Sequence, residues 1–207
     1  MSTLAGKALD RAIDAALEAA DKYAMGTSDV QKAAASIAKR LADLGVDYAI
    51  AGAIALDVHG FRRLTQDVDV LISREGLARF KTQWLGRGYV DVFRGSKAVR
   101  DTEHDVRIDF LIAGDFPGDG EPKPVAFPEP QDVVVAGERY RSISLKALIE
   151  LKLASGMTAA HRMRDLDDVM RLIRANGLAR EFGDELAPYV RAKNTELWEL
   201  AQIDEDY

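Results

Sequence analysis

The spacing of apolar residues predicts two helices at the start of the chain. Between residues 4 and 24, apolar side chains recur at the period of one helical face, and they are Leu4, Ala8, Leu9, Ala12, Ile13, Ala16, Leu17 and Ala20. The sequence Gly26-Thr27-Ser28-Asp29 is typical of a helix end followed by the cap of the next helix. A second helix with one apolar face is therefore expected from there to about Gly45.

The middle of the chain alternates between strand and helix patterns. Short apolar runs that are typical of strands lie at residues 48–51, 68–72, 89–93 and 106–112. Helical patterns lie between them, a short one that ends before Gly60 and a longer one over residues 75–85. This mixture predicts the α+β class, with a mixed β-sheet flanked by helices.

The last part of the chain begins with a proline-rich segment and then becomes helical. Five of the six prolines fall between residues 114 and 131, which predicts a loop or flap. A hairpin is expected after it, formed by residues 133–135 and 139–143. Helical periodicity then covers roughly residues 145–154, 159–176 and 178–203. We expect three parts: an N-terminal amphipathic helix (1–28), an α/β core (29–143) and a helical C-terminal region (144–207).

Composition narrows the class of protein. The 207 residues are 47% hydrophobic and 30% charged, as in a globular domain, and the net charge of −6 disfavours broad coating of nucleic acid. The absence of cysteine excludes disulfides, thiolate zinc sites and a cysteine nucleophile. No apolar run reaches the ~20 residues that span a bilayer, and Asp10, Asp14 and Glu18 interrupt any signal-peptide core. We therefore expect a cytoplasmic protein without membrane association.

Three aspartates on predicted strands are the strongest candidates for chemistry. Asp67 and Asp69 alternate with Val68 and Val70, so both carboxylates point to one side while the valines point into the core. Asp109 interrupts a later apolar strand. Close carboxylates raise one another's pKa unless a cation lies between them, and Mg²⁺ prefers one or two carboxylates plus substrate phosphates. Three carboxylates on adjacent strands are able to hold two Mg²⁺ ions for a displacement at phosphorus.

The wider pattern around these aspartates resembles a known enzyme superfamily. Three motifs carry the resemblance, namely Gly52-Ala53, Arg63-x-Thr65-x-Asp67-Val68-Asp69 and Ile108-Asp109-Phe110-Leu111. Together they look like the small bacterial members of the polymerase-beta-type nucleotidyltransferases. The resemblance implies a nucleotidyltransferase fold with a nucleotide site that includes Gly52, Ala53, Arg63 and Thr65. It also implies that the three aspartates are the catalytic residues and the metal ligands.

A second similarity lies in the predicted C-terminal helices. The segments are Leu148-Ile149-Glu150-Leu151-Lys152-Leu153-Ala154 and Arg164-Asp165-Leu166-Asp167-Asp168-Val169. They resemble abortive-infection-type (AbiEii-like) nucleotidyltransferase toxins, in which such a lysine faces the triphosphate. The resemblance, which covers about residues 36–175, implies that Lys152 contacts phosphate, that Asp165 is a supporting or catalytic acid, and that an antitoxin is a partner. Ala53 departs from the usual Gly or Ser, which removes a hydroxyl contact to phosphate but keeps the backbone N–H.

Each candidate also has a purely structural interpretation. Asp67 and Asp69 fit a solvated strand end, and Asp109 fits an exposed position paired with Arg107. Arg62, Arg63 and Thr65 fit a surface turn, and Lys152 fits a lysine that extends from an apolar helix to solvent. Asp165 and Asp168 fit helix caps or ion pairs with Arg164 and Arg171. The alanine-rich first helix is interpreted as a packing or homodimer element.

We expect a magnesium-dependent transferase that moves a nucleoside monophosphate from an NTP to a hydroxyl or phosphate acceptor on tRNA, a protein or a small molecule. A polyanionic acceptor is favoured if the basic residues near the acidic motif line one groove, and these are Arg74, Arg79, Lys81, Arg87, Arg94, Lys97, Arg100 and Arg107. One alternative is a non-catalytic nucleotide-binding regulatory relative, which Ala53 favours. Another is a metal-dependent phosphodiesterase, which the lack of a histidine near the acids disfavours.

Overall fold

The computed structural model describes residues 2–137 and 139–203 and, in the first helix, side chains from residue 12 onward. The sheet in this part of the chain has seven strands in the order β3-β4-β5-β2-β1-β7-β6. The strands are β1 (Tyr48–Ile50), β2 (Asp67–Ile72), β3 (Tyr89–Asp91), β4 (Ala98–Asp101), β5 (Val106–Ile112), β6 (Val134–Val135) and β7 (Ser142–Ile143). Strand pairs β2–β5 and β1–β7 are parallel and the others are antiparallel, so the sheet is mixed.

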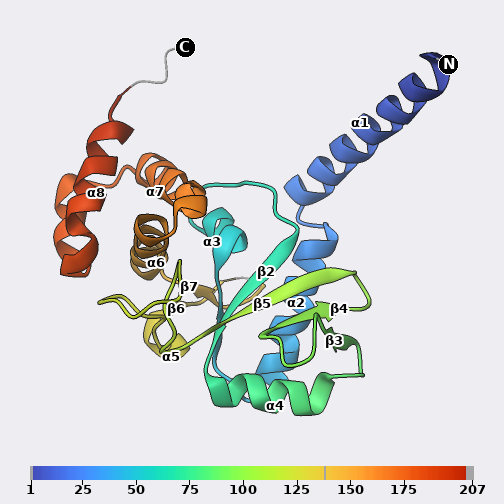
Figure 1. Cartoon of the computed structure of the whole chain (residues 1–207), viewed down its shortest axis with the longest axis horizontal. Coiled ribbons are helices and arrows are strands. Elements are labelled where there is room, and N and C mark those ends of the chain that lie inside the picture. The colour runs from blue at the N-terminus through green and yellow to red at the C-terminus, as the bar shows by residue number, and fades with distance from the viewer. Residues whose placement is uncertain (1, 138, 204–207) are drawn as a thin grey trace.

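Helices flank this sheet on both sides (Figure 1). They are α1 (Ser2–Ala24), α2 (Asp29–Asp43), α3 (Gly52–Val58), α4 (Arg74–Trp84), α5 (Pro130–Val133), α6 (Leu145–Thr158), α7 (Met163–Asn176) and α8 (Pro188–Ala201). The α+β class and the mixed sheet with flanking helices, as predicted from the sequence, are confirmed. Within the described residues, no helix is both long and apolar enough to cross a membrane.

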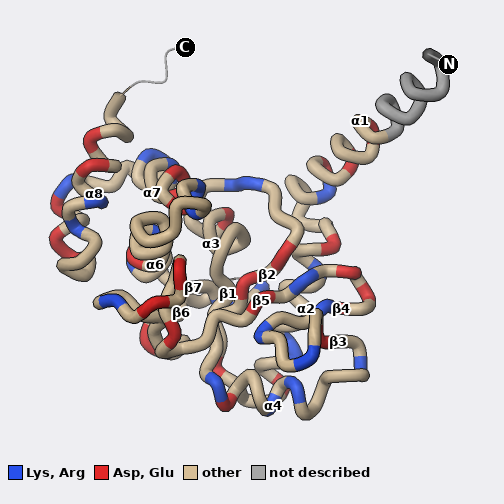
Figure 2. The backbone as a smooth tube through the Cα atoms, viewed as in Figure 1, with Lys and Arg blue, Asp and Glu red and all other residues tan. Residues whose placement is uncertain are grey.

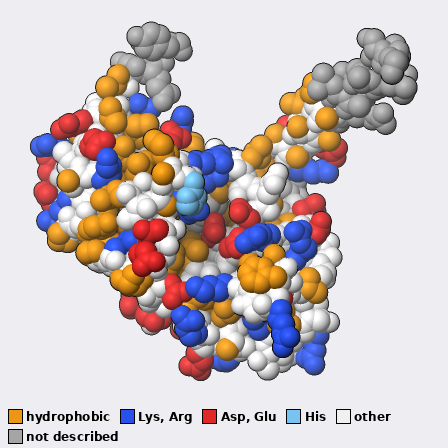
Figure 3. All heavy atoms as spheres, viewed as in Figure 1, with side chains coloured by type: hydrophobic (Ala, Val, Ile, Leu, Met, Phe, Trp, Pro, Cys, Tyr) orange, Lys and Arg blue, Asp and Glu red, His pale blue; other side chains and the backbone are white. Residues whose placement is uncertain are grey.

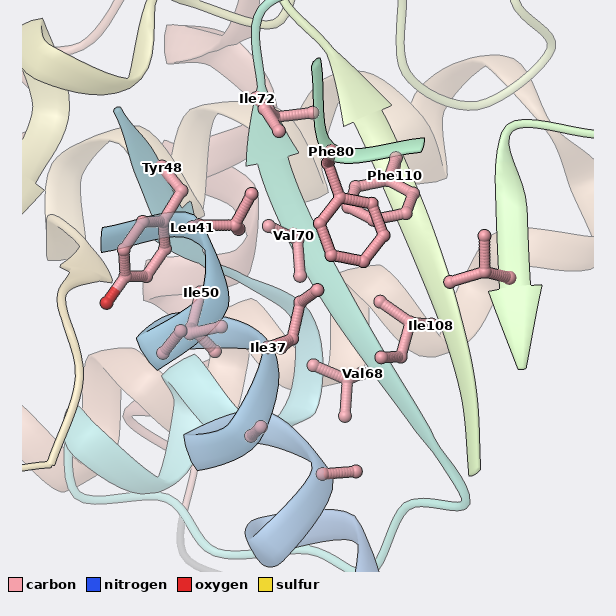
Figure 4. Packing of buried hydrophobic residues seen from close by; sticks show 14 of the residues in the cluster. Ile37, Leu41, Tyr48, Ile50, Val68, Val70, Ile72, Phe80, Ile108 and Phe110 are labelled. Carbon is pink, nitrogen blue, oxygen red and sulfur yellow. The ribbon is translucent and has the colours of Figure 1, made fainter. Parts of the chain in front are cut away.

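One hydrophobic core lies between the sheet and helices α2 and α4 (Figure 4). Ile37 and Leu41 of α2 are fully buried there against strand residues. Phe80 of α4 is also fully buried and meets Tyr89 edge-on, with ring centroids 5.1 Å apart, and Phe110 at 5.5 Å. These contacts fix α4 and the end of the sheet that carries β3, β4 and β5.

Strand alternation divides β2 and β5 between this core and the opposite face. Val68 and Val70 point into the core with α2 and α4, whereas Leu71 packs into a second core with α3, α6, α7 and α8. Asp67 and Asp69 share the face of Leu71 because side chains two apart on a strand point the same way. The C-terminal helices therefore cover one end of this face, and the acidic end remains accessible.

Helix α1 is joined to the body of the protein at its C-terminal end and projects away from it elsewhere (Figure 1). Gln31 donates a hydrogen bond to the carbonyl oxygen of Tyr23 at 3.1 Å, and Arg62 donates one to that of Ala24 at 2.9 Å. Ile13 and Leu17 are 49% and 60% exposed, so this part of the predicted apolar stripe has no packing partner within the described chain. The stripe residues Leu4, Ala8 and Leu9 lie outside the described side chains.

Several predicted element boundaries were wrong. The single helix expected over residues 178–203 is a 3₁₀ segment, Arg180–Glu185, followed by α8, which starts at Pro188 because proline has no N–H and fits only the first helical turn. Strand β4 was missed because its four residues include only two apolar ones. Helix α5 was also missed, and the expected hairpin forms through β6 and β7, with strands of two residues each.

Replacement of Phe80 by Ala tests the core beneath α4. We expect a loss of about 3–5 kcal/mol in the free energy of unfolding, because a fully buried aromatic ring is removed and a cavity remains. Phe93, which is 66% exposed, is the matched control, and its replacement by Ala should change the value by less than about 0.5 kcal/mol. Urea denaturation followed by circular dichroism measures both, and equal losses would contradict the assigned packing.

Candidate active site

A cavity of about 1190 Å³ opens over the acidic end of β2 and β5. Figure 3 shows acidic and basic side chains meeting in this hollow, between the C-terminal helices and the sheet. Its walls come from α1, the start of α3, the segment before β2, strands β2 and β5, α6 and the start of α7. All the site residues predicted from the sequence line it, namely Gly52, Ala53, Arg63, Thr65, Asp67, Asp69, Asp109, Lys152 and Asp165. Their roles in binding or catalysis stay predictions.

The three aspartates come together because β2 and β5 are parallel neighbours. Asp69 lies opposite Asp109 in the register of the two strands, and Asp67 lies opposite Arg107. Neighbouring strands are about 4.8 Å apart, and residues paired in this way point to the same face. Asp67, Asp69 and Asp109 therefore occupy adjacent positions on one surface, as predicted.

The turn that enters α3 is pressed against Asp69. The Ala51 backbone N–H donates to the carbonyl oxygen of Asp69 at 2.9 Å, and Gly52 adopts a φ of +58°. A Cβ atom on Gly52 would lie 1.8 Å from Asp69 Oδ2, which is a severe overlap. Both the left-handed backbone and the close approach therefore require glycine at this position.

The charge of Asp69 is unfavourable in this structure. Burial of the carboxyl group, and then the nearby Asp67 and Asp109, raise the pKa of Asp69 from its ordinary value of 3.8 to about 6. Lys152 and Arg162 act in the opposite direction but do not outweigh these effects. A cation placed between the carboxylates would remove the repulsion, so the site is electrostatically suited to a metal ion.

Asp109 and Asp67 already have partners in the protein. Arg107 donates to both carboxylate oxygens of Asp109 through Nε, at 3.0 and 2.8 Å, and through Nη2 at 2.7 Å. Thr65 donates to Asp67 Oδ1 at 2.5 Å. Over residues 2–137 and 139–203, no group of three or more His, Asp or Glu side chains is placed to hold a metal ion. Arg107 binds both oxygens of Asp109, so this carboxylate becomes available to a cation only when the pair opens.

A buried cluster of charged side chains forms the opposite wall. Lys152 Nζ donates to Asp165 Oδ1 at 3.0 Å and to Asp168 Oδ2 at 2.6 Å. Arg63 makes two hydrogen bonds to Asp168, at 3.0 and 3.1 Å, and thereby joins the segment before β2 to α7. Arg162 donates to Asp165 at 2.9 Å. Both Lys152 and Asp168 are buried, so each charge depends on these partners.

Asp165 is held in its ionised form by this cluster. Burial by itself would raise the pKa of Asp165, but Lys152, the hydroxyl of Ser155 and Arg162 together lower it below the usual range. Ser155 contributes a hydrogen bond of 2.7 Å to Asp165 Oδ2. Asp165 therefore serves as a fixed negative charge for Lys152 and Arg162, which is a structural role in addition to any catalytic one.

Some predicted pairings were wrong. Asp168 pairs with Arg63 and Lys152, whereas the sequence suggested Arg164 or Arg171, and Arg171 pairs with Asp167. These partners lie far apart in the sequence, so helical spacing alone could not identify them. Lys152 does not reach to solvent, as a lysine on an apolar helix commonly would, because two buried carboxylates bind it.

The basic residues near the acidic motif do not line one groove. Of the eight considered, only Lys97 and Arg107 reach the cavity. Arg74 and Lys97 pair with Asp115, and Lys81 pairs with Asp91. The others lie on α4, in the α4–β3 turn, in the β3–β4 turn or on β4 (Figure 2). The predicted support for a polyanionic acceptor is therefore absent from the cavity wall.

Sequence reasoning missed several residues that line the cavity. They come from α1, from α6 and from the turn just before α7, and include Glu18, Lys22, Tyr23, Ser155 and Arg162. Ser155 and Arg162 carry no sequence signal by themselves, because their importance comes from contact with Asp165. The involvement of α1 follows only from the tertiary position of its C-terminal end.

Comparison with known proteins identifies no family for the chain. No family model matches it, and no curated protein matches it. Among solved structures, it is similar to ANT(2″)-Ia in complex with adenylyl-2″-tobramycin, with 16% identity over 76% of this chain and 92% of that chain and a TM-score of 0.49. A solution structure of the antibiotic-resistance factor ANT(2″)-Ia has 17% identity over 82% and 83% of the two chains, with a TM-score of 0.38. These similarities are too distant to assign an activity, and the predicted closeness to abortive-infection toxins is not shown.

Replacement of Asp69 by Asn tests the unfavourable charge at this position. Because the pKa of Asp69 is about 6 in the folded chain and lower in the unfolded one, the contribution of Asp69 to stability should fall as the pH rises from about 4 to 6. Without divalent cations, Asp69→Asn should gain about 2–3 kcal/mol relative to wild type over this range. Denaturant melts at several pH values measure the difference, which Asp105→Asn, at an exposed residue outside the cavity, should not show.

Replacement of Asp168 by Asn tests the buried cluster. The variant removes the negative partner of Arg63 and leaves the buried Lys152 with Asp165 alone, so we expect a loss of about 3–5 kcal/mol in the free energy of unfolding. The neighbouring Asp167, whose side chain is 45% exposed, is the matched control and should cost less than about 1 kcal/mol. If urea denaturation gave equal losses for the two variants, the cluster would not contribute to stability as the contacts indicate.

Proposed function

We propose that the chain is a nucleotidyltransferase that transfers a nucleoside monophosphate from an NTP to a hydroxyl or phosphate acceptor. One observation carries the proposal: Asp67, Asp69 and Asp109 face a single cavity whose opposite wall contains Lys152 and Arg162. Carboxylates on one side and cations on the other suit a metal-bound triphosphate, because phosphoryl-transfer sites stabilise negative charge that spreads over the phosphate oxygens.

The residues present fit Mg²⁺ as the cofactor. Asp67 and Asp69 would hold the ion together with substrate phosphates, and Asp109 would join them once it is released from Arg107. The raised pKa of Asp69 supports this donor set, since its carboxylate is short of positive charge. When bound, the metal would polarise the phosphates and lower the pKa of an acceptor hydroxyl.

Side chains of the cavity would then accept the proton and stabilise the phosphates during the transfer step. The acceptor oxygen attacks the α-phosphorus, the bond from that phosphorus to the bridging oxygen of the β-phosphate breaks, and pyrophosphate leaves. Asp109 is the candidate to receive the proton of the acceptor hydroxyl, which requires its pair with Arg107 to open. Positive charge from Lys152, Arg63 and Arg162 would stabilise the triphosphate from the C-terminal wall.

The cavity has room for two substrates. Its volume of about 1190 Å³ exceeds the usual ~300–1,000 Å³ of a site for one small ligand, so a nucleotide and part of an acceptor fit together. A small molecule or a protein side chain is the acceptor class that we favour, because only two of the eight basic residues near the acidic motif line the cavity. A toxin role with an antitoxin partner remains a prediction from the sequence alone.

A non-catalytic nucleotide-binding relative is the second candidate function. It is favoured by the three hydrogen bonds with which Arg107 holds Asp109, and by Ala53 at the start of α3. A regulatory protein of this kind would bind an NTP and Mg²⁺ but form no product. Isothermal titration with each NTP, combined with a transfer assay in cell extract, separates the two functions.

The Asp69→Asn variant tests the proposed activity. We expect transfer of label from α-³²P-NTP to fall by at least about 100-fold, because the central carboxylate of the proposed metal site is removed. Asp105→Asn is the matched control, since Asp105 is exposed, lies outside the cavity and has a φ of +55° that Asn tolerates. Mass spectrometry of tRNA, protein and small-molecule fractions after incubation with each NTP would identify the acceptor. Undiminished labelling by Asp69→Asn would overturn the proposal.

A further inference from the structure

Most of the positive charges that line the cavity are already bound by carboxylates of the protein. The pairs are Lys22 with Glu18, Arg63 with Asp168, Lys97 with Asp115, Arg107 with Asp109, Lys152 with Asp165 and Asp168, and Arg162 with Asp165. The N···O separations range from 2.5 Å for Lys97 to 3.0 Å for Arg63. A cation engaged in this way must give up a protein partner or share its donors before it binds a substrate phosphate.

Arg164 differs from these residues. It lines the cavity and is exposed, and across residues 2–137 and 139–203 it has no hydrogen bond or ion pair. It lies in the first turn of α7, next to Asp165, whose carboxylate is fixed by Lys152 and Arg162. All five donors of its guanidinium are therefore available, on a helix whose position is set by buried ion pairs.

The charge of the surrounding cluster also favours an anion. Arg63, Lys152 and Arg162 carry three positive charges against the two carboxylates of Asp165 and Asp168. Arg164 adds a further positive charge at the cavity side of this cluster. Within the cluster, Arg63 and Lys152 balance the two buried carboxylates, so the excess comes from Arg162, which is 51% exposed, and from Arg164. Positive charge that faces a cavity in this way is suited to a ligand of several negative charges.

Lys152 is less suited to be the main phosphate contact. Two of its three N–H donors are used by Asp165 and Asp168, at 3.0 and 2.6 Å, and its side chain is only 8% exposed. A guanidinium, in contrast, presents paired donors that match two phosphate oxygens. Lys152, the residue that resembles the lysine of abortive-infection toxins, therefore holds the C-terminal wall in position. Arg164 is free to bind phosphate.

We propose that Arg164 binds the terminal phosphates of the donor nucleotide, an inference that rests on the proposed nucleotidyltransferase function. The ligand class is an inorganic or nucleotide-linked triphosphate, and the guanidinium of Arg164 donates hydrogen bonds to its β- or γ-phosphate oxygens. Lys152 acts as a positioning residue that holds Asp165 and Asp168, and through them Arg162 and Arg63, at the edge of the site.

Calorimetric titration of the full chain tests this role. The probes are inorganic tripolyphosphate and the four NTPs, each with Mg²⁺, and the corresponding nucleosides. Arg164→Gln should weaken binding of tripolyphosphate and of the preferred NTP about tenfold or more, and leave nucleoside affinity unchanged. Arg164→Lys should recover part of the loss, because it restores the charge without the paired donors.

The matched control is Arg171→Gln. Arg171 lies on the same helix seven residues later, pairs with Asp167 and does not line the cavity, so its loss should not change tripolyphosphate affinity. Thermal unfolding of Arg164→Gln should match that of wild type, since the side chain has no partner within the described residues. An equal loss of affinity in the Arg164 and Arg171 variants would overturn the proposal, because it would indicate a general charge effect.

The remaining outcomes separate this inference from the proposed function. If the wild-type chain binds tripolyphosphate and NTP, and Arg164→Gln binds them equally well, the assignment of Arg164 fails while the nucleotidyltransferase proposal stands. If Arg164→Gln loses affinity for total tRNA and retains it for NTP, Arg164 belongs to an acceptor site and the assignment also fails. If wild type binds no NTP, both proposals fail together.

Discussion

The parallel pairing of β2 with β5 determines both the core and the candidate site. Along each strand, alternate side chains point to opposite faces. Val68, Val70 and Ile108 are fully buried on one face, which fixes the register of the two strands. The same register places Asp69 beside Asp109 on the other face. A shift of one residue in either strand would bury a carboxylate and expose an aliphatic side chain, so packing of the core enforces the alignment of the acids.

The alignment of the three carboxylates is electrostatically unfavourable, and positive charges around the cavity compensate for it in part. Three carboxylates on adjacent positions repel one another, and the structure offsets this through Arg107 at Asp109 and through cations on the opposite wall. The offset is incomplete at Asp69, whose surroundings still favour the protonated form. Incomplete compensation is what a site for an additional cation requires, since a fully neutralised cluster would gain little from metal binding.

Local sequence pattern was enough to predict the class of fold and the shared face of Asp67 and Asp69, because strand alternation is a property of neighbouring residues. It also identified Gly52 as part of a motif, although the reason, a near contact with Asp69, depends on tertiary structure. The partners of Arg63 and Lys152 could not be predicted, since Asp168 is 105 residues from Arg63 and is buried only after α6 and α7 pack together. Non-local contacts of this kind leave no periodic signal.

The ion pair between Arg63 and Asp168 connects the segment before β2 to helix α7. The side chain of Asp168 is 1% exposed, so separating the pair would leave a charge in a dry interior. A hinge motion between the segment before β2 and helix α7 is therefore unfavourable. The cavity wall that these two elements form should therefore keep its shape when a ligand enters.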